Sequence, residues 1–289
     1  AQFGSNYGIA NAGKTGRPDQ IAVDAIVQDA WGNGIREFDT AQGYGKSEQA
    51  LGEALSKLGV STDALIISKF DPALDHLDRG VLSNALDESL SRLGVTSLYG
   101  MMLHREELLS LWDKGLSRIL HDFVLSGRVK YIGVSVYSPG RAIQALNTEG
   151  IDIVQLPTNI LDRRFEIAGV FQLAEKKNKK IYIRSVFLQG LILMDPEWIS
   201  EKMSFTQPVL ERLKHLSEDL GLTRQEIALG YIKSAIPNSR VVFGADNPEQ
   251  VKKNLLCWKK EPSQYMVLQV KKLFDCIDEK VLNPTLWPN

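Results

Sequence analysis

The sequence predicts a single α/β domain over residues 1–289, folded as a (β/α)8 TIM barrel with an extra helix near its C-terminus. Three observations predict this fold class. Short apolar segments alternate with helical ones along the whole chain, the composition shows no break, and the length suits one barrel. The hydrophobic fraction of 44% also supplies enough apolar material for one large core.

Seven segments are predicted to be strands buried on both faces, because each is short, apolar and often rich in Val, Ile, Tyr or Phe. They are Ile35–Phe38, Ala64–Lys69, Leu98–Leu103, Tyr131–Ser135, Ile151–Leu156, Ile181–Val186 and Val241–Gly244. An eighth strand, truncated at its start, is expected at Ala1–Gly4. Eight parallel strands joined by right-handed crossovers close into a barrel.

The main alternative is an open, doubly wound sheet, which usually carries a glycine-rich phosphate loop after its first strand. Here the first strand is followed by Gly4-Ser-Asn-Tyr-Gly8, which lacks the G-x-G-x-x-G spacing. The barrel is therefore the preferred prediction.

Helix start and stop signals separate the strands. They are Pro18 and Gly32 at the two ends of the first helix, Ser138–Pro139 and Asn247–Pro248 at two helix starts, and the capping box Thr223–Glu226 before a helix that stops at Pro237. Two segments depart from simple alternation. Phe187–Gln207 has no helical period and is long for a loop, and Ser263–Lys280 is the extra helix.

Charge and cysteine content narrow the classes of function. The 34 basic and 35 acidic residues give a net charge of −1, which does not support binding to nucleic acid or to an anionic membrane. No apolar run is long enough to span a membrane. Cys257 and Cys276 lack the spacing of a metal site or of a disulfide framework, and the first residues lack the regions of a signal peptide. We therefore expect reduced thiols in a cytoplasmic protein.

Polar side chains follow three consecutive predicted strands at the points where the strands end. Asp39, Lys69 and His104 occupy these positions, and Tyr44 lies in a glycine-flanked loop after Asp39. The carboxyl ends of the strands of a barrel meet at one mouth, so we expect the four side chains to converge there. A Lys or a His at one strand end is more often structural, but placement at three successive ends favours a shared function.

These four residues suit proton transfer to a carbonyl oxygen. Burial would raise the pKa of the Tyr44 phenol, whereas the ammonium group of Lys69 would lower it, and Asp39 would keep Lys69 charged and oriented. His104 would donate a hydrogen bond to the substrate oxygen or tune the phenol. The phenol would then protonate the alkoxide that forms as hydride reaches a carbonyl carbon, or deprotonate an alcohol in the reverse direction.

The segment Gly34–Gly52, which contains Asp39 and Tyr44, closely resembles the signature of the aldo-keto reductases. Lys69 in Ile-Ile-Ser-Lys-Phe and His104 in Met-Leu-His-Arg match the remaining catalytic positions of that family. The resemblance continues through Tyr131–Ser135, Gln155–Asn159, Arg184–Leu191 and Phe243–Asn254, and so covers nearly the whole chain. It implies a barrel oxidoreductase that moves hydride between a nicotinamide cofactor and a carbonyl or an alcohol, with Tyr44 as the general acid.

The resemblance also implies where the cofactor binds, extended across the mouth. The nicotinamide carboxamide would meet Ser135 and Gln155, the pyrophosphate would pass Ser185, Leu188 and Gln189, and the adenosine end would meet Gly244, Gln250 and Asn254. The usual phosphate site of barrels, after the last two strands, lies in the same region. Taken alone, Gln155 and Asn159 would be explained equally well as residues that form hydrogen bonds to turn and backbone groups.

Three departures from the family pattern bear on the cofactor. Val136 replaces an amide residue after Ser135, and Arg184 stands where an aromatic ring often stacks on the nicotinamide, so that a guanidinium would stack there. Asp246 occupies a stretch in which many relatives present basic or hydroxyl groups to the 2′-phosphate; it would repel that phosphate but accept hydrogen bonds from a ribose hydroxyl. The family implies NADP(H), and Asp246 leaves NAD(H) open. Lys252 or Lys253 would offset the repulsion.

The predicted function is reduction of an aldehyde, a ketone or a sugar-derived carbonyl. The same machinery in reverse is an NAD(P)-dependent sugar or polyol dehydrogenase, and Phe3–Ala10 and Val186–Leu191 resemble bacterial members from surface-polysaccharide and sugar-nucleotide pathways. A cofactor-binding regulatory subunit, like the potassium-channel beta subunits of this superfamily, is a further alternative, against which the complete tetrad argues. A metal enzyme or hydrolase has no support, because only His104 of the four histidines lies at a strand end.

Substrate identity is predicted to depend on the loops at the mouth. These are Asn6–Thr15, the loop after His104, Phe187–Gln207 and the tail Val281–Asn289. Trp112, Trp198 and Trp287 lie in or near these loops and are candidate pocket walls, with core packing as the alternative role. The expected partner is a small molecule, and the sequence indicates no oligomeric state.

Overall fold

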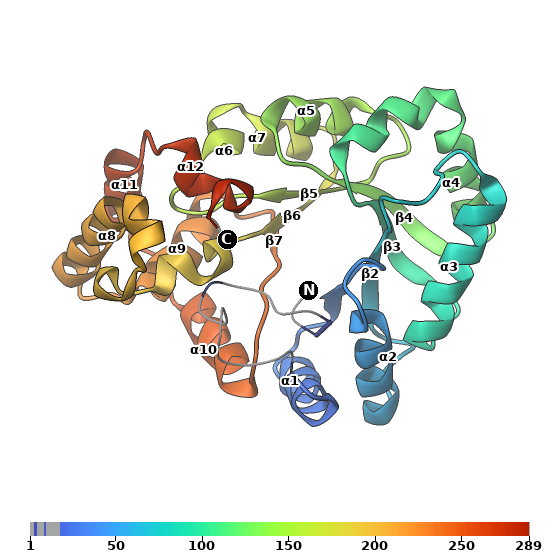
Figure 1. Ribbon diagram of the computed structural model, residues 1–289, viewed down its shortest axis with the longest axis horizontal. Helices are drawn as coiled ribbons and strands as arrows, with labels where there is room; N and C mark the ends of the chain where they lie inside the picture. The colour runs from blue at the N-terminus through green and yellow to red at the C-terminus, as the bar shows by residue number, and fades with distance from the viewer. Residues whose placement is uncertain (1–2, 5–8, 10–17, 289) are drawn as a thin grey trace.

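The computed structural model describes residues 3–4, 9 and 18–288, in which strands and helices alternate along the chain (Figure 1). The strands are β1 (Glu37–Asp39), β2 (Leu65–Phe70), β3 (Leu98–Leu103), β4 (Val129–Ser135), β5 (Ile153–Pro157), β6 (Lys180–Arg184) and β7 (Arg240–Val241). The α-helices are α1 (Gln20–Gly32), α2 (Ser47–Leu58), α3 (Arg79–Leu93), α4 (Leu116–Leu125), α5 (Pro139–Asn147), α6 (Arg164–Ile167), α7 (Val170–Lys176), α8 (Gln207–Leu220), α9 (Arg224–Ala235), α10 (Pro248–Lys259), α11 (Gln264–Leu273) and α12 (Glu279–Leu282). Short 3-10 helices lie between them at η2 (Glu106–Lys114), η3 (Leu188–Leu193), η4 (Pro196–Trp198), η5 (Glu201–Thr206) and η6 (Pro284–Leu286).

The strands form one parallel sheet in the order β1-β2-β3-β4-β5-β6-β7, which is their order in the sequence. Figure 1 shows the sheet curling, with helices on its outer side. This confirms an α/β fold of parallel strands, and each of the seven expected strands overlaps an observed one. The last strand is shorter than predicted. Its ladder with β6 ends at the pair Ile183 and Val241, two residues before Ser185, which has a φ of 60° in the left-handed region.

The predicted eighth strand is not confirmed. Of the expected residues 1–4, the first two lie outside the described residues, and Phe3 and Gly4 form a turn. Within the described part of the chain, no backbone ladder joins β1 to β7. The ring of helices is nevertheless continuous at this position, because α10 packs against both α9 and α1.

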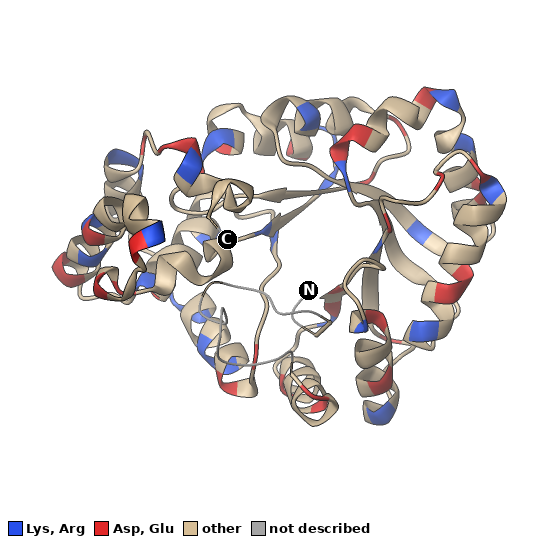
Figure 2. Cartoon of the chain, viewed as in Figure 1, with Lys and Arg blue, Asp and Glu red and all other residues tan. Residues whose placement is uncertain are grey.

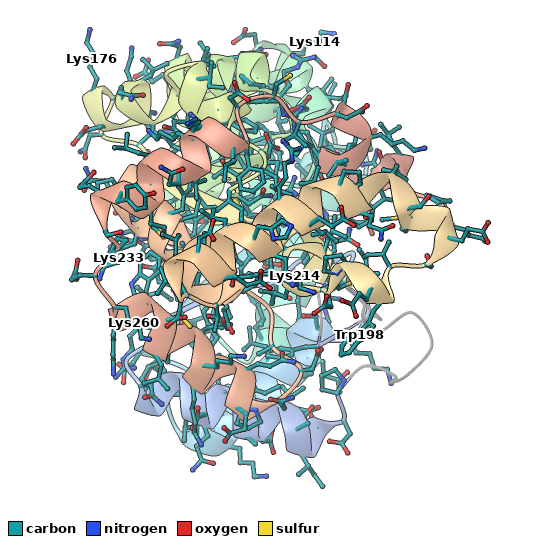
Figure 3. The ribbon with its side chains drawn as sticks, turned by 90° about the vertical axis from the view of Figure 1, so that its left-hand side faces the viewer. Lys114, Lys176, Trp198, Lys214, Lys233 and Lys260 are labelled. Atoms are coloured by element: carbon teal, nitrogen blue, oxygen red, sulfur yellow. The ribbon has the colours of Figure 1, made fainter. Side chains whose placement is uncertain are left out.

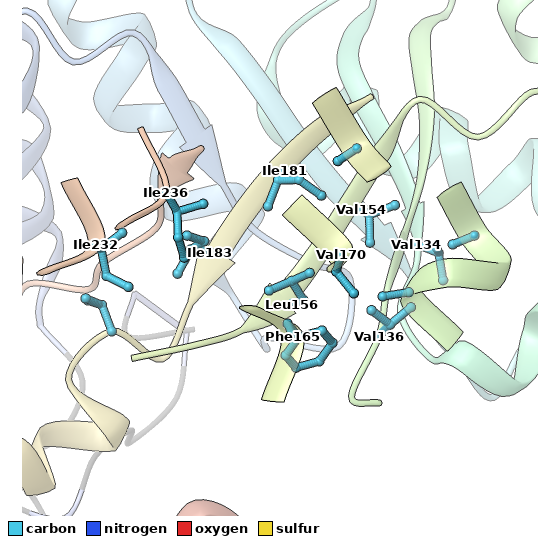
Figure 4. Close-up of a cluster of buried hydrophobic side chains, with 14 of the residues drawn as sticks. Val134, Val136, Val154, Leu156, Phe165, Val170, Ile181, Ile183, Ile232 and Ile236 are labelled. Carbon is cyan, nitrogen blue, oxygen red and sulfur yellow. The ribbon is translucent and has the colours of Figure 1, made fainter. Parts of the chain in front are cut away.

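The alternation of side chains along each strand gives apolar cores on both faces of the sheet. The outer core lies between the sheet and the helices, where Val154 and Ile181 of the sheet face Val170 of α7 (Figure 4). The inner core lies inside the curled sheet and contains Ile67, Met102, Ile153 and Tyr182.

Gly100 in β3 makes room for the inner core. A Cβ atom at this position would lie 2.8 Å from Cδ1 of Ile153 and 3.3 Å from Cγ1 of Ile67, closer than the usual separation of packed carbon atoms. Gly133 in β4 meets Ile153 in the same way, with 2.8 Å to its Cβ atom. The two glycines therefore let Ile153 fill the centre of the curled sheet.

Side chains connect β1, β6 and β7 near the amino ends of β1 and β7. Arg240 Nε donates a hydrogen bond to Glu37 Oε1 at 2.9 Å, and the Tyr182 hydroxyl donates to the other oxygen of the same carboxylate. We call Glu37, Tyr182 and Arg240 the seam cluster. A cavity of about 440 Å³ lies along the same seam and is lined largely by apolar residues, including Phe3 and Phe243.

Three segments differ in detail from the prediction. The first helix begins at Gln20, because Asp19 is its N-cap and accepts a hydrogen bond from the Ala22 N–H at 2.8 Å; Pro18 therefore precedes the helix. The extra helix ends at Leu273, and Asp278 caps the separate helix α12. The long loop 187–207 contains the three short 3-10 helices η3, η4 and η5.

Charged side chains of both signs are spread over the outer helices (Figure 2). Among the residues that the structure describes, no helix combines the length and the apolar character needed to cross a membrane. Both cysteines are free; Cys257 is buried, as expected of a core thiol, whereas Cys276 is exposed.

Candidate active site

The alternation of side chains along the strands places the predicted residues in one layer. In β2, β3 and β5, a step of two residues leads from the inner core to the carboxyl end of the strand. This step leads from Ile67 to Lys69, from Met102 to His104 and from Ile153 to Gln155. The same step leads from Glu37 to Asp39, from Gly133 to Ser135 and from Tyr182 to Arg184. Six predicted site residues therefore lie at the carboxyl edge of the sheet, directly above the inner core.

Lys69 and Asp39 form a buried ion pair in this layer. Lys69 Nζ donates to the two Asp39 carboxylate oxygens at 2.8 and 2.7 Å and to the Thr40 carbonyl oxygen at 2.8 Å. These three acceptors match the three N–H donors of an ammonium group. Burial of the Lys69 side chain lowers its pKa, whereas the Asp39 carboxylate acts in the opposite direction. Removing one partner of such a pair leaves a buried, uncompensated charge, at a cost of about 3–5 kcal/mol.

Gln155 contacts the same carboxylate. Its Nε2 donates to Asp39 Oδ1 at 2.8 Å, across 116 residues of sequence. Ser135 at the end of β4 pairs with Gln155 in the sheet register and is buried beside it. Gln155 therefore orients Asp39 directly, a role that sequence reasoning did not assign to it.

Tyr44 and His104 lie next to the ion pair. Their rings pack edge to face, with centroids 5.4 Å apart and an angle of 82° between the ring planes. Lys69 Nζ lies 5.2 Å from the centroid of the Tyr44 ring. Burial and the Lys69 cation lower the pKa of His104 to about 4, so its imidazole is neutral at neutral pH. The buried Nδ1 of His104 has no hydrogen-bond partner among the described residues.

Burial and the Asp39 carboxylate raise the pKa of Tyr44 above its ordinary value, in the direction that the sequence predicts for burial. The lowering that the sequence predicts from Lys69 does not prevail. The physical reason is that Lys69 directs all three of its N–H donors to Asp39 and Thr40, so its charge is compensated within the pair. Tyr44 is therefore a neutral phenol, which is the form that donates a proton.

Arg184 reaches the same mouth from the end of β6. Its guanidinium carbon lies 4.3 Å from the centroid of the Tyr137 ring, a cation–π contact. Its Nη1 donates a long hydrogen bond of 3.4 Å to Ser185 Oγ. Its buried Nη2 has no hydrogen-bond partner within the described part of the chain.

Tyr137 and Glu106 are site residues that sequence reasoning missed. One oxygen of the Glu106 carboxylate accepts hydrogen bonds from the backbone N–H groups of Tyr137 at 2.6 Å and Ser138 at 3.2 Å, and so fixes the loop after β4. Their positions in the sequence could have identified them, because Glu106 follows His104 by two residues and Tyr137 follows Ser135 by two residues.

The backbone after β6 adopts a rare conformation. Ser185, Leu188 and Gln189 have φ values of 60°, 47° and 56°. Such a conformation costs a non-glycine residue about 1–2 kcal/mol, and strain of this kind gathers at functional sites. Asn159 Nδ2 supports the turn by donating to the Ser185 carbonyl oxygen at 3.1 Å. This is the segment that the resemblance assigns to the cofactor pyrophosphate.

The residues predicted for the adenosine end gather around the start of α10. The Asp246 N–H donates to Gln250 Oε1 at 2.8 Å, and the Gln250 N–H donates to Asn247 Oδ1 at 3.0 Å. Gly244 is exposed just before them. Asn254 is buried in α10, where its side-chain oxygen accepts a hydrogen bond from Gln225. Asp246, Asn247 and Gln250 therefore lie together at the N-terminus of α10, whereas the side chain of Asn254 is already bonded to Gln225.

The three tryptophans do not form one pocket wall. Trp112 is a core residue: it is buried, and its ring meets Gly150, which precedes β5 and so lies at the end of the sheet opposite the mouth. The side chain of Trp198 is 79% exposed, at the outer surface seen in Figure 3. Trp287 Nε1 donates to the Lys280 carbonyl oxygen at 3.0 Å, which anchors the tail. The prediction for Trp112 is thus corrected, because the helix η2 turns its ring into the core.

The carboxyl edge of this curled parallel sheet carries Tyr44, a neutral His104 and the buried Lys69–Asp39 pair. These residues suit an oxidoreductase that acts on a carbonyl or an alcohol. The model of the aldo/keto reductase family matches residues 6–275. The chain therefore belongs to the aldo/keto reductase family and is an NAD(P)-dependent oxidoreductase.

Individual relatives agree with this assignment. The chain is 24% identical to the L-glyceraldehyde 3-phosphate reductase of Escherichia coli, over 86% of this chain and 80% of the relative. It is 26% identical to the NADH-specific methylglyoxal reductase of Escherichia coli, over 82% of each. An aldo-keto reductase structure from Bacillus halodurans (holo form) superimposes with a TM-score of 0.72 at 24% identity, over 88% of this chain and 87% of that chain, and shares the fold.

Proposed function

We propose that this chain reduces an aldehyde, a ketone or a sugar-derived carbonyl with NAD(P)H. The observation that supports this proposal is the convergence of Tyr44, His104 and the Lys69–Asp39 pair in one layer at the carboxyl edge of the sheet. No other reaction class accounts as simply for a neutral phenol and a neutral imidazole packed beside a compensated, buried ion pair.

Each residue has a separate role in the proposed reaction. Tyr44 donates its proton to the substrate oxygen while the carbonyl carbon accepts hydride, so that an alcohol forms. The neutral imidazole of His104 donates an N–H to the same oxygen and thereby positions it. The Lys69–Asp39 pair lies beside the Tyr44 ring, with Lys69 Nζ 5.2 Å from the ring centroid, and keeps this side of the site rigid. The nicotinamide cofactor supplies the hydride when it is bound.

The residues at the mouth fit a nicotinamide dinucleotide. Buried nitrogen atoms of His104 and Arg184 lack partners among the described residues, as expected where bound cofactor and substrate together supply the acceptors. Tyr137 covers one face of the Arg184 guanidinium, and the proposed place of the nicotinamide ring is the opposite face. The remaining proposed contacts are Ser135 and Gln155 at the carboxamide, Ser185, Leu188 and Gln189 at the pyrophosphate, and Gly244, Asp246, Gln250 and Asn254 at the adenosine end.

We propose that NAD(H) is accepted at least as well as NADP(H), although the family as a whole implies NADP(H). The Asp246 carboxylate at the adenosine end would repel a 2′-phosphate. Lys252, which would offset this repulsion, lies 3.7 Å from Asp29 and 3.3 Å from Glu249 in two ion pairs. The name of the NADH-specific relative is in line with this proposal.

The substrate class is proposed from the relatives. One is named for a phosphorylated glyceraldehyde and one for methylglyoxal, which are both small carbonyl compounds. A sugar-derived or similarly small carbonyl is therefore the expected substrate, and we propose that the protein acts on free small molecules in the cytoplasm. The exposed, unpaired Cys276 is in line with a reducing compartment.

We further propose that an eighth strand closes the barrel between β1 and β7. The apolar cavity along the seam between β1 and β7, lined in part by Phe3, is in line with a strand at this place. The continuous ring of helices outside it supports the same closure.

The general-acid role is tested by Tyr44→Phe. We expect this change to lower turnover by at least about 100-fold, because general acid catalysis typically contributes this much. Binding of NADH and NADPH, followed by quenching of tryptophan fluorescence, should be nearly unchanged. Tyr265→Phe, on the exposed surface of α11, is the matched control and should leave both turnover and binding as in the parent.

Three outcomes are informative. Comparable turnover in the Tyr44→Phe variant would refute the acid role. Loss of cofactor binding in this variant would place Tyr44 in the cofactor site instead. A parent protein that binds neither cofactor would contradict the proposed function as a whole, and the ratio of the two affinities tests the proposed effect of Asp246.

A further inference from the structure

The mouth contains a cation that the proposed proton transfer does not use. Three cations, Lys69, Arg184 and Arg105, lower the pKa of His104, and the Asp39 carboxylate opposes them. Lys69 and Asp39 compensate each other within their ion pair, and Arg105 is exposed. The Arg184 guanidinium is thus the charge at the edge of the sheet that remains to be balanced.

The contacts of Arg184 leave a specific part of it available. Its face packs on the Tyr137 ring, and one edge N–H makes the long bond to Ser185 Oγ. The Nη2 group is buried and makes no hydrogen bond to any described residue. A buried charged donor without a partner is costly, so an acceptor is expected at this place when the site is in use.

Neighbouring carboxylates do not serve as that acceptor. Glu106 is committed to the backbone N–H groups of Tyr137 and Ser138, and Asp39 is committed to Lys69 and Gln155. Among the described residues, no ion pair within 4 Å links Arg184 to an acidic side chain. The planar guanidinium edge is the group that best matches the oxygens of a carboxylate or a phosphate.

We propose that Arg184 recognises an anionic group of the substrate, so that the preferred carbonyl compounds carry a carboxylate or a phosphate. The stacked Tyr137 fixes the orientation of the guanidinium, and the Nη2 edge binds the anion while Tyr44 protonates the carbonyl oxygen. This inference rests on the proposed reductase function and adds the substrate class to it.

The test compares matched pairs of substrates. Succinic semialdehyde is compared with butanal, and glyceraldehyde 3-phosphate with glyceraldehyde, each at saturating cofactor. The quantity measured is the ratio of kcat/KM for the anionic member to that for the neutral member. We expect a ratio of at least about ten in the parent for one pair or both, because a hydrogen bond to a charged group is worth about this much. The pair with the larger ratio distinguishes a carboxylate from a phosphate.

Three variants locate the effect. Arg184→Met should reduce the ratio by at least about tenfold, and Arg184→Lys, which keeps the charge but loses the planar edge, should retain part of it. Arg105→Met removes an exposed cation that follows β3 at the same edge of the sheet and is the matched control; its ratio should stay within about twofold of the parent. Circular dichroism and cofactor affinity are measured for each variant, so that unfolding or loss of cofactor is recognised.

Each failure has its own meaning. Equal kcat/KM for the anionic and neutral members in the parent would overturn the proposal. An Arg184→Met variant that loses cofactor affinity but keeps the parent ratio would also overturn it, because Arg184 would then serve the cofactor alone. A parent protein that reduces neither member of any pair would instead contradict the proposed reductase function.

Discussion

Hydrogen-bond partners decide what each side chain at the mouth can do. Lys69 gives all of its donors to Asp39 and Thr40, so neither Tyr44 nor His104 receives a hydrogen bond from it. Burial and the Lys69 cation keep the His104 imidazole neutral, and burial and the Asp39 carboxylate keep the Tyr44 phenol protonated. Two neutral donors beside a rigid ion pair are preorganised for the negative charge that develops on a reduced carbonyl oxygen.

The depressed pKa of His104 predicts a pH dependence of stability. Its pKa is about 4 in the folded chain and 6.5 as an ordinary value. Between these values the unfolded chain binds the proton more readily, so stability falls as the pH falls from 6.5 toward 4. We expect His104→Gln to show a shallower fall of Tm over this interval than the parent. Burial also lowers the pKa of His76. Because His76 is present in both proteins, its contribution to the pH dependence cancels in the comparison.

The measurement is thermal unfolding of both proteins at a series of pH values, together with an NMR titration of the histidine ring protons. Equal slopes of Tm against pH for parent and variant would show that His104 is protonated as easily in the folded chain as in the unfolded one.

At the scale of elements, the proposed site residues lie at the carboxyl ends of the strands, and side chains close in sequence cap the starts of several helices. In α9, Thr223 Oγ1 accepts from the Glu226 N–H at 3.2 Å, and Glu226 Oε2 accepts from the Thr223 N–H at 2.7 Å. This confirms the capping box that the sequence predicts. Glu226 also pairs with Lys260, beyond the end of α10, so one carboxylate joins two neighbouring helices.

Glu226→Gln is expected to destabilise the protein by less than about 1 kcal/mol at neutral pH, because it removes the charge that pairs with Lys260 while the new amide oxygen can still accept from the Thr223 N–H. Lys260 first and Thr223 next lower the pKa of Glu226 to about 2 from an ordinary value of 4.5. The stabilisation by this carboxylate is therefore present above 4.5 and is lost as the pH falls toward 2. Urea unfolding at neutral and acidic pH checks this, with Glu211→Gln on the exposed face of α8 as the control. A difference between Glu226→Gln and parent that does not shrink in acid would contradict the assignment.

At the scale of the whole molecule, the curled sheet has one seam that backbone pairing does not close within the described residues. The seam cluster of Glu37, Tyr182 and Arg240 spans it with side chains. Burial and the Glu37 carboxylate raise the pKa of Tyr182, so this phenol stays protonated and keeps donating to Glu37. The cluster and the contact of α10 with α1 therefore hold together the first and last strands of the sheet.

Tyr182→Phe removes the hydroxyl that donates to one oxygen of the Glu37 carboxylate, so that among the described residues Arg240 is the side chain that still donates to it. We expect the change to destabilise the protein by about 1–3 kcal/mol. Urea unfolding measures the effect. Tyr265→Phe removes a hydroxyl from a side chain that is 62% exposed, and it should change stability by less than about 0.5 kcal/mol. Equal effects of the two changes would mean that the seam cluster contributes nothing to closure.

The sequence by itself determined the parallel α/β fold, the seven strands and the family, and it pointed to Asp39, Tyr44, Lys69 and His104. It could do so because strand burial has a local period of two, and because the ends of parallel strands share one edge. Local signals of this kind need no knowledge of which strands become neighbours.

Only the tertiary structure decided which partners these side chains find. The bond from Gln155 to Asp39, the Tyr137 ring under Arg184 and the seam cluster join residues that are far apart in the chain. Such contacts depend on register, curvature and closure of the sheet, which no short stretch of sequence specifies. For the same reason only the structure shows that burial and Asp39 outweigh Lys69 in setting the pKa of Tyr44, and that the ring of Trp112 lies in the core.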